Sequence, residues 1–448
     1  MTDSATGRLR FRSFAGRSVQ AKFDAGRLTS DGGLVWLAQA DRSLGLCETL
    51  AACIPEWRRR PVHSLRTLVR QRIFQIACGY ADQNDADTLR ADPLLKLVCG
   101  RLPESGADLA SQPTFSRLEN AVDRHACEAL AEALVELYIR ERQRQGVPSH
   151  LMLDLDGTDD PTHGDQEGSA YHGFYGEHMY HPLLVFDGQT DQLICAVLRP
   201  GNCHGSRFVV LVLRRLIRRL RAAWPKLSIE IRADSGFAVP RLYAWCEQQQ
   251  VTYTIGLIPN RRLTVIAAPL LTQALAQSAA EGGAKVRLAG ETAYQARTWP
   301  TPRRVVYKAE ALAKGPNTRF VVTTRTEAPL QVYDWYVDRG QPENYVKDLK
   351  NALQADRLSD HRFWANAFRL LLHAAAYWLL DTLRRWLLRV IGEAARVQLD
   401  TLRLRLLKIG GRLRELPGRI HLHLASSHPG EPLWRALATP GTLMNNPG

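Results

Sequence analysis

The sequence lacks most features of secreted and membrane proteins. Its eight cysteines are spread over 448 residues and include no Cys-x2-Cys pair, so a disulfide framework or a zinc site is not expected and reduced cytosolic thiols fit better. Residues 1–12 are polar and contain no apolar signal segment. No window has about 18 uninterrupted apolar residues, and the nearest to one, Leu370 to Leu380, is too short to span a membrane and is followed by arginines. These absences predict a soluble cytoplasmic protein with no membrane partner.

Lysine is also scarce, although the chain is strongly basic. The net charge is +14, and the pI is about 9.6. Of the 59 basic residues 9 are lysine, which leaves 59 − 9 = 50 arginines. A positive charge of this size predicts a polyanionic partner, most simply nucleic acid. A GC-rich genome would also favour arginine, so charge alone does not decide the function.

The first third of the chain has the periodicity of helices. Ser64 is expected to cap a helix that begins at Leu65, and a long helix is expected from about Asp123 to Arg142. Ser30 or Asp31 is expected to cap an earlier helix. Ser111 to Asn120 reads either as a recognition helix for a DNA groove or as an ordinary capped helix start. This region is predicted to be a helical DNA-binding domain, with a basic arm in its first 27 residues.

From Leu151 the period changes from that of helices to that of strands. Buried strands alternate with helices in the order β-β-β-α-β-α-β, which is the order of an RNase H-like domain. The α/β fold class follows from that order. The expected strands are 151–156, 181–187, 192–198, 227–234 and 251–256, and the expected helices are 206–224 and 240–250.

The rest of the chain divides into three parts. β-rich runs separated by Gly/Pro turns predict an inserted β subdomain, a long apolar helix is expected from Ala365 to Val390, and the sequence after Gly410 reads as a Pro/Gly-rich tail. The long helix is expected to close the core or to join a dimer. The predicted parts are a helical DNA-binding domain (1–145), the first part of an RNase H-like core (146–259), the β-rich insertion (260–335), the second part of the core with the long helix (336–391) and the C-terminal tail (392–448).

One stretch near residue 340 concentrates chemistry on a predicted helix. It has the pattern Tyr336-x2-Arg339-x3-Glu343-x6-Lys350. A proline two residues into the helix suits its first turn, and Lys347 and Lys350 follow Glu343 at i+4 and i+7, on the same face. A carboxylate beside two ammonium groups can hold a metal ion and a phosphate together. The plainer alternative is a solvated helix face with an i,i+4 Glu–Lys pair.

Two aspartates upstream complete a set of three carboxylates. Asp156 ends the first predicted strand and Asp234 ends the fourth, and these two strands are neighbours in the expected fold. Clustered carboxylates remain ionised together only when cations neutralise them. Mg²⁺, for which Mn²⁺ is expected to substitute, prefers such oxygen ligands and activates water or a 3′-hydroxyl in phosphoryl transfer. Asp154 lies on the same face of its strand as Asp156 and is the alternative first aspartate.

Other acidic and imidazole side chains in this region are expected to have no catalytic role. Three aspartates are interpreted as loop residues, and four histidines have no regular zinc-ligand spacing and are interpreted as non-ligands. These residues are Asp159, Asp160, Asp165, His163, His172, His178 and His181.

In combination, these motifs resemble the insertion sequence 1380 family of bacterial DDE transposases, from about Arg27 to His428. The resemblance implies an RNase H-like catalytic fold in which Asp156, Asp234 and Glu343 bind Mg²⁺, and it favours Asp156 over Asp154, because Asp-Gly-Thr after a strand is typical of the family. The motifs are Leu153-Asp-Leu-Asp-Gly-Thr158, Leu198-Arg-Pro-Gly-Asn202, Arg232-Ala-Asp-Ser-Gly-Phe237, the Tyr336 to Lys350 pattern and Ala365-Asn-Ala-Phe-Arg-Leu-Leu-Leu-His373.

The same resemblance implies the partners of the protein. Double-stranded DNA is expected as terminal inverted repeats and as target, on which a homodimer or higher multimer nicks strands and transfers them. Contacts to phosphates at the transposon end are expected from Tyr336, Arg339, Lys347 and Lys350. Two alternatives remain open: a nuclease of the same fold that does not integrate DNA, and a DNA-binding protein or transposition inhibitor derived from a transposase.

Overall fold

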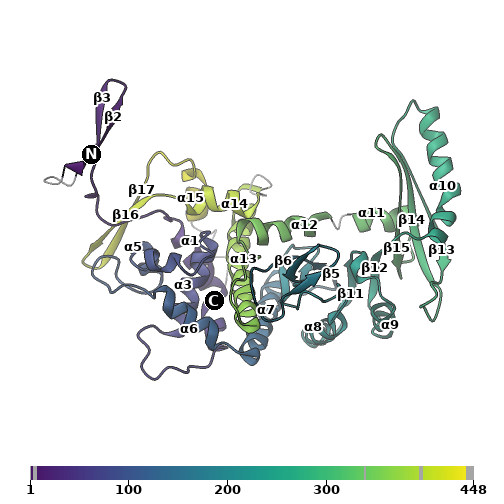
Figure 1. Ribbon diagram of the computed structural model, residues 1–448, viewed down its shortest axis with the longest axis horizontal. Helices are drawn as coiled ribbons and strands as arrows, with labels where there is room; N and C mark the ends of the chain where they lie inside the picture. Colours follow the sequence, from purple (N-terminus) through teal and green to yellow (C-terminus); the bar gives the residue numbers. More distant parts are fainter. Residues whose placement is uncertain (1, 4–7, 338–339, 393–396, 440–448) are drawn as a thin grey trace.

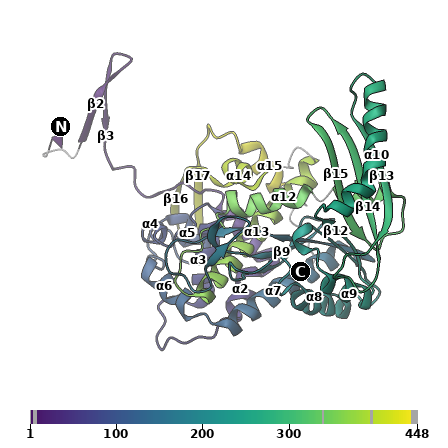
Figure 2. The same cartoon turned by 45° about the vertical axis from the view of Figure 1, so that its right-hand side comes forward.

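The structure is a computed structural model that describes residues 2–3, 8–337, 340–392 and 397–439, without the side chains of residues 2, 3, 8 and 340–343. The molecule is elongated, with helices at one end, a large sheet at the other, and helix α13 (Phe363–Ile391) between them (Figure 1). A hairpin of the N-terminal segment projects beyond the helical end, as a second view also shows (Figure 2).

The helical end is built from capped helices, as the sequence predicts. The Ser64 hydroxyl accepts a hydrogen bond from the Thr67 N–H, which confirms the predicted cap. The long helix expected from about Asp123 also forms, and the Asp123 carboxylate caps it by accepting a hydrogen bond from the Ala126 N–H. The first helix has Gly33 at its N-cap, and not Ser30 or Asp31. The helices are α1 (Leu34–Leu44), α2 (Leu46–Ala52), α3 (Leu65–Ala77), α4 (Asp85–Leu89), α5 (Pro93–Val98), α6 (Gln112–Ala121) and α7 (Arg124–Gln145), preceded by strands β1 (Thr2–Asp3), β2 (Arg8–Phe14), β3 (Arg17–Ala21) and β4 (Leu28–Thr29).

An eight-stranded mixed sheet forms the other end, in the order β10-β9-β5-β11-β12-β15-β14-β13. The five strands expected between residues 151 and 257 all form. β5 and β9 pair antiparallel, as do β9 and β10, whereas β11 lies parallel to both β5 and β12. The elements are β5 (His150–Gly157), β9 (Leu183–Asp187), β10 (Leu193–Val197), α8 (Val209–Ala223), β11 (Ser228–Ala233), α9 (Pro240–Gln248) and β12 (Thr252–Leu257), and a small sheet of β6 (Asp160–Pro161), β8 (Glu177–Tyr180) and β7 (Ala170–His172) lies between β5 and β9 in sequence.

The strands of the region predicted as an inserted β subdomain continue the same sheet. Strands β13 (Val286–Tyr294), β14 (Arg303–Leu312) and β15 (Gly315–Thr323) form there, and β15 pairs antiparallel with β12 through Thr323 and Thr254. The prediction missed helix α10 (Arg261–Ala280), which packs on these strands through Leu263, Ala267 and Ala274. Its apolar residues without clear helical periodicity, and Pro269 within it, hid the helix.

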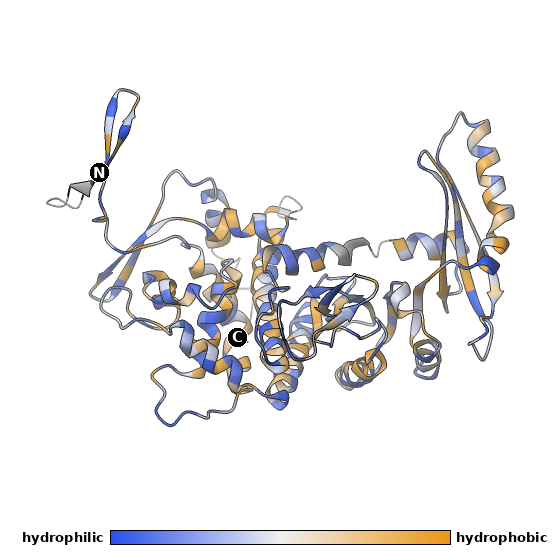
Figure 3. Ribbon diagram, viewed as in Figure 1, coloured by the Kyte–Doolittle hydropathy of each residue, from blue (hydrophilic) through white to orange (hydrophobic). Residues whose placement is uncertain are grey.

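Helix α10 is also the one helix in the described ranges that is long and apolar enough to cross a membrane. Only 17% of that window is buried within the protein, and the helix is largely orange in the hydropathy view (Figure 3). Length and composition alone do not identify a membrane span, and the buried residues Leu263, Ala267 and Ala274 of this helix pack against the sheet.

The predicted C-terminal tail is folded. Its described part contains helix α14 (Leu399–Leu402), a π-helical turn (Arg403–Leu407), the hairpin β16 (Gly411–Leu416) and β17 (Arg419–Leu424), and helix α15 (Glu431–Ala438). Strand β16 pairs with β4 at the other end of the chain, where Gly411 faces Thr29. The alternating residues of β16 and β17 on either side of Pro417-Gly418 are a hairpin signal that the tail interpretation overlooked.

Helix α13 joins both ends of the molecule. The sequence predicts it from Ala365 to Val390, and the structure confirms it, with nearly every residue before Leu388 buried. It packs against α1, α3, α6 and α7 and also against β10. One continuous hydrophobic cluster therefore runs from the helices into the sheet. The helix closes the core of this chain, which was one of the two roles expected for it.

Candidate active site

Two aspartates lie side by side where parallel strands β5 and β11 end. The register pairs Ala233 with Leu155, so the next residues, Asp234 and Asp156, are neighbours at the carboxyl edge of the sheet. Both side chains are partly exposed. The Asp234 carboxylate also accepts a hydrogen bond from the Gly236 N–H at 2.8 Å, which caps the short 3-10 turn Ser235–Phe237. Asp234 therefore caps this turn and also lies beside Asp156 at the edge of the sheet.

Asp154 lies in a different environment. It faces Arg232 on β11, and the guanidinium donates to both carboxylate oxygens at 2.7 and 2.8 Å. Both side chains are buried, and Arg232 also donates to the Trp335 carbonyl oxygen at 2.9 Å. A buried bidentate ion pair leaves Asp154 neutralised within the sheet. This arrangement favours Asp156 as the functional aspartate of the strand.

Tyr175, in the β7–β8 loop, senses the charge of the two aspartates. The pKa of Tyr175 is raised to about 12 by burial and then by the charges of Asp159, Asp156 and Asp234. Three carboxylates thus act on one phenol, and the edge of the sheet is a region of negative potential. Such a region attracts cations, and the donor set of carboxylate oxygens fits a hard divalent ion such as Mg²⁺.

His181 and Arg199 form the wall beside Asp156. Burial lowers the pKa of His181 to about 4, so its ring is neutral at pH 7, and its Nδ1 lies 2.8 Å from the Cys203 carbonyl oxygen. Its Nε2 faces Gly157, where an added Cβ would lie 2.8 Å away. The glycine after Asp156 is therefore required by the close approach of the imidazole. The predicted family motif contains this glycine, but its physical reason is visible only in the structure.

Arg199, from the Leu198 to Asn202 motif, is buried and fixes the loop behind this wall. It donates to the carbonyl oxygens of His181 at 2.7 Å and of Gly205 at 2.6 Å. Burial lowers the pKa of its guanidinium to about 10, which still leaves the side chain charged at pH 7. Through Arg199, the motif thus connects the backbone at His181, beside Gly157, with the loop at Gly205.

The third predicted carboxylate, Glu343, lies on helix α12 (Gly340–Lys347), but its side chain is outside the described part of the structure. Arg339 is outside it altogether. Among the residues that the structure describes, no group of three or more His, Cys, Asp or Glu side chains has the arrangement of a metal site. The convergence of Asp156, Asp234 and Glu343 therefore stays a prediction.

The helix after Glu343 does not continue as a regular α-helix. A π-helical turn, Asp348–Ala352, follows α12, so the expected α-helical face from Glu343 to Lys350 is interrupted. The buried Asp348 carboxylate holds this turn, because it accepts hydrogen bonds from Arg384 on α13 at 2.9 Å and from the Leu399 N–H at 3.0 Å. These partners are distant in sequence, which is why helical spacing alone could not predict the turn.

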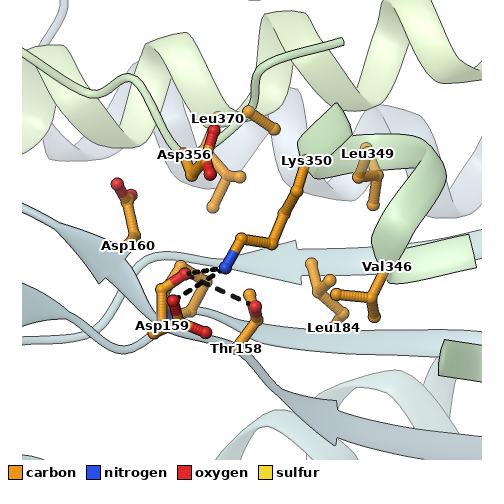
Figure 4. A pocket seen from close by; sticks show the side chains of 11 residues that line it. Thr158, Asp159, Asp160, Leu184, Val346, Leu349, Lys350, Asp356 and Leu370 are labelled. Atoms are coloured by element: carbon orange, nitrogen blue, oxygen red, sulfur yellow. Dashed lines mark hydrogen bonds and ion pairs between the residues drawn. The ribbon is translucent and has the colours of Figure 1, made fainter. Parts of the chain in front are cut away.

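Lys350 projects from that turn onto the end of β5. Its ammonium group lies 2.8 Å from the Asp159 carboxylate and 3.1 Å from the Asp159 carbonyl oxygen (Figure 4). Asp160, next in sequence, is buried, and burial with the charge of Asp356 raises the pKa of its carboxyl well above the ordinary value. Sequence reasoning assigned both aspartates to a loop. The run of acidic residues directly after the strand in the sequence was the one feature that could have indicated a role for Asp159 and Asp160.

The other predicted DNA contacts differ in exposure. Lys347 is exposed on α12. Tyr336, on α11 (Pro329–Val337), is half-buried, and its hydroxyl donates to the Ala233 carbonyl oxygen at 3.3 Å. An added Cβ at Gly256 would lie 2.7 Å from that hydroxyl, so Tyr336 packs against the strand ends directly behind Asp234. The structure does not test whether any of these residues contacts DNA.

Comparison with protein families identifies the class to which this fold and site belong. The model of the family described as "Transposase DDE domain group 1" matches residues 11–440. This match covers nearly the whole chain, and the protein belongs to that family of DDE transposases.

Two further comparisons add little. A solved structure, "Cryo-EM structure of piggyBac transposase synaptic complex with hairpin DNA", is similar with 13% sequence identity and a TM-score of 0.42, over 84% of this chain and 80% of that chain. At this TM-score the likeness carries no argument about function. A comparison with curated proteins found no match.

Proposed function

We propose that the protein is a cut-and-paste transposase that cleaves DNA at terminal inverted repeats and joins the freed ends to target DNA. The proposal rests on one observation above all, which is that adjacent parallel strands bring Asp156 and Asp234 together in a chain of the DDE transposase family. The sheet order β10-β9-β5-β11-β12 supports an RNase H-like core. The motifs support the finer assignment to the insertion sequence 1380 family.

In this mechanism each residue has a defined task. Asp156, Asp234 and Glu343 would hold divalent cations, and Mg²⁺ or Mn²⁺, when bound, supplies the Lewis acid that activates the attacking oxygen and stabilises the leaving one. Arg199 and His181 keep the wall beside Asp156 in place. Tyr336, Arg339, Lys347 and Lys350 would bind phosphates of the transposon end. A multimer acting on double-stranded DNA in the cytoplasm completes the proposal.

The first test is cleavage of a duplex that carries the end of the element. Wild-type protein should cleave it with Mg²⁺ or Mn²⁺ and not in excess chelator, whereas Asp234→Asn and Glu343→Gln should still bind the duplex but cleave it orders of magnitude more slowly. Binding persists because most affinity for DNA comes from basic contacts to phosphates. Undiminished cleavage in excess chelator would overturn the metal mechanism.

The second test separates transposition from the alternatives. A pre-cleaved end with a free 3′-hydroxyl is incubated with target plasmid, and joined products are measured. Joined products that depend on Asp156 support a transposase. Cleavage without joining would show a nuclease of the same fold, and binding without either reaction would show a DNA-binding derivative.

A further inference from the structure

The hairpin β16–β17 has two faces of opposite character. Leu413 is buried, and Ile420 and Leu422 pack against the hydrophobic core of the helical end. Because side chains alternate along a strand, the residues between them point outward. The outward positions that are exposed hold only cationic or imidazole side chains: Arg412, Arg414, Arg419, His421 and His423.

These outward residues stand opposite one another across the hairpin. The register pairs Arg412 with His423 and Arg414 with His421. Directly opposed side chains on one face have Cβ atoms only about 4.5–5.5 Å apart. Each of these pairs places one guanidinium beside one imidazole, so the outward face gathers its three arginines and two histidines within a small area.

The hairpin's own acidic side chain does not offset this charge. Glu415, the acidic residue of the hairpin, points to the other side, where it accepts hydrogen bonds from the Ser105 hydroxyl at 2.7 Å and from the N–H groups of Glu104 and Ser105 at 3.2 Å. In the described part of the chain, Arg412, Arg414 and Arg419 make no ion pair. Elsewhere exposed arginines often have acidic neighbours, as Arg219 on α8 has in Glu136.

We propose that the outward face of β16–β17 binds the phosphate backbone of double-stranded DNA, outside the site of cleavage. On β16 the outward arginines are two residues apart, about 6.6–6.8 Å along the strand, and β17 adds Arg419, so the ribbon presents three positive charges to a polymer that carries one negative charge per about 1.7 Å of helix axis. A second copy of the chain does not fit, because a symmetric contact would oppose identical positive faces. A membrane does not fit either, because the exposed positions of this face offer no aromatic or aliphatic anchor.

The location of the hairpin gives this surface a distinct role. It covers the helical end, whereas Asp156 and Asp234 lie on the central sheet beyond α13 (Figures 1 and 2). Contacts here would add affinity and position the duplex, without any part in the chemical step. The inference deepens the proposed function and rests on it for the identity of the DNA, but binding itself is independent of sequence and of cleavage.

The test compares two triple variants of equal charge. Arg412→Gln/Arg414→Gln/Arg419→Gln removes the proposed contacts, and Arg214→Gln/Arg218→Gln/Arg241→Gln removes three exposed arginines from α8 and α9. Affinity is measured over a salt series on a duplex with the element end and on a duplex of unrelated sequence. If each arginine contacts one phosphate, the three contacts contribute about 2.7 units to the slope of log affinity against log salt. The ratio of wild-type affinity to that of the hairpin variant should therefore fall about 40-fold between roughly 50 and 200 mM salt.

The expected result is a reduced slope on both duplexes for the hairpin variant and a smaller change for the helix variant. Equal losses in both variants, or no loss in the hairpin variant, would overturn the proposal. If wild type cleaves no DNA at all, the proposed function fails, but the salt series on the unrelated duplex still decides whether the surface binds DNA.

Two further measurements guard against misfolding. Replacement of the same three arginines by lysine keeps the charge and should restore most of the salt slope. In wild-type protein, a reagent specific for arginine should modify these three side chains more slowly when duplex DNA is bound. Unchanged modification rates in the presence of saturating DNA would contradict the proposal without any variant.

Discussion

The two aspartates of strand β5 should respond to the same substitution in opposite ways. Asp154→Asn leaves the buried Arg232 opposite a neutral amide, and breaking a buried ion pair by removing one partner costs about 3–5 kcal/mol. With an unfolding entropy of about 2.1 cal/mol/K per residue, a chain of 448 residues shifts its Tm by about 1 °C per kcal/mol, so the Tm should fall by about 3–5 °C. Asp156→Asn removes one of two neighbouring carboxylates at a partly exposed edge, so the free energy of unfolding should change by no more than about 0.5 kcal/mol.

The effect on cleavage should be reversed. If Asp156 holds the metal ions, its loss removes several kcal/mol of stabilisation of the transition state, which is about three orders of magnitude in rate. Asp154→Asn, assayed below its lowered Tm, should cleave at a rate close to that of wild type. The assays are thermal unfolding by tryptophan fluorescence and single-turnover cleavage of a duplex carrying the element end.

A double variant serves as the control for the stability argument. Asp154→Leu with Arg232→Met replaces the ion pair by apolar side chains and should recover much of the stability lost in the single variant. If Asp156→Asn cleaves normally while Asp154→Asn folds as wild type but does not cleave, the two assignments are exchanged and the interpretation of this edge is wrong.

Three other variants test further parts of the structure. Burial lowers the pKa of His373 to about 3, below its ordinary value near 6.5. The folded state therefore favours the neutral ring, and the stability that depends on it is lost as the pH falls from about 6.5 towards 3. His373→Gln removes this titrating group, so the fall in Tm between pH 7 and pH 4 should be smaller in the variant than in wild type. Gly157→Ala places a methyl group 2.8 Å from His181 Nε2 and should lower the free energy of unfolding by about 1–3 kcal/mol, measured by denaturation. Lys350→Ala should reduce the salt slope of DNA binding by about one unit, whereas Asp159→Asn, which removes the anion that competes for Lys350, should tighten binding; an unchanged slope in the first variant would contradict a phosphate contact.

The central strands could be predicted from sequence because their signal is local. Runs of buried aliphatic residues define β5, β9, β10, β11 and β12, and the order of strands and helices brings Asp156 and Asp234 to one edge. Two neighbouring carboxylates are therefore the most predictable feature of the protein. The choice of Asp156 over Asp154 on β5 came from the family resemblance and not from the strand pattern.

What the sequence could not show depends on contacts between distant segments. The pairing of Asp154 with Arg232 depends on the register of β5 against β11, and the π-helical turn at Asp348 depends on Arg384 of α13. The ion pair of Lys350 with Asp159 joins residues 191 positions apart. Propensity and periodicity contain no information on such partners. The extension of the sheet by β15 was missed for the same reason.

The pairing of β4 with β16 has a consequence for synthesis of the chain on the ribosome. The N–H groups of Gly32 and Gly33, at the start of α1, donate to the carbonyl oxygens of Ile409 and Leu407, and an added Cβ at Gly33 would lie 2.3 Å from the Leu406 carbonyl oxygen. The contacts at the start of the first helix are therefore completed only after a strand has been made that lies 411 − 32 = 379 residues later in the chain. At about 5–20 residues per second, that delay is roughly 20–75 s. A nascent chain that stalls before Gly411 leaves β4 without its partner, and only a chain translated beyond that residue completes the helical end.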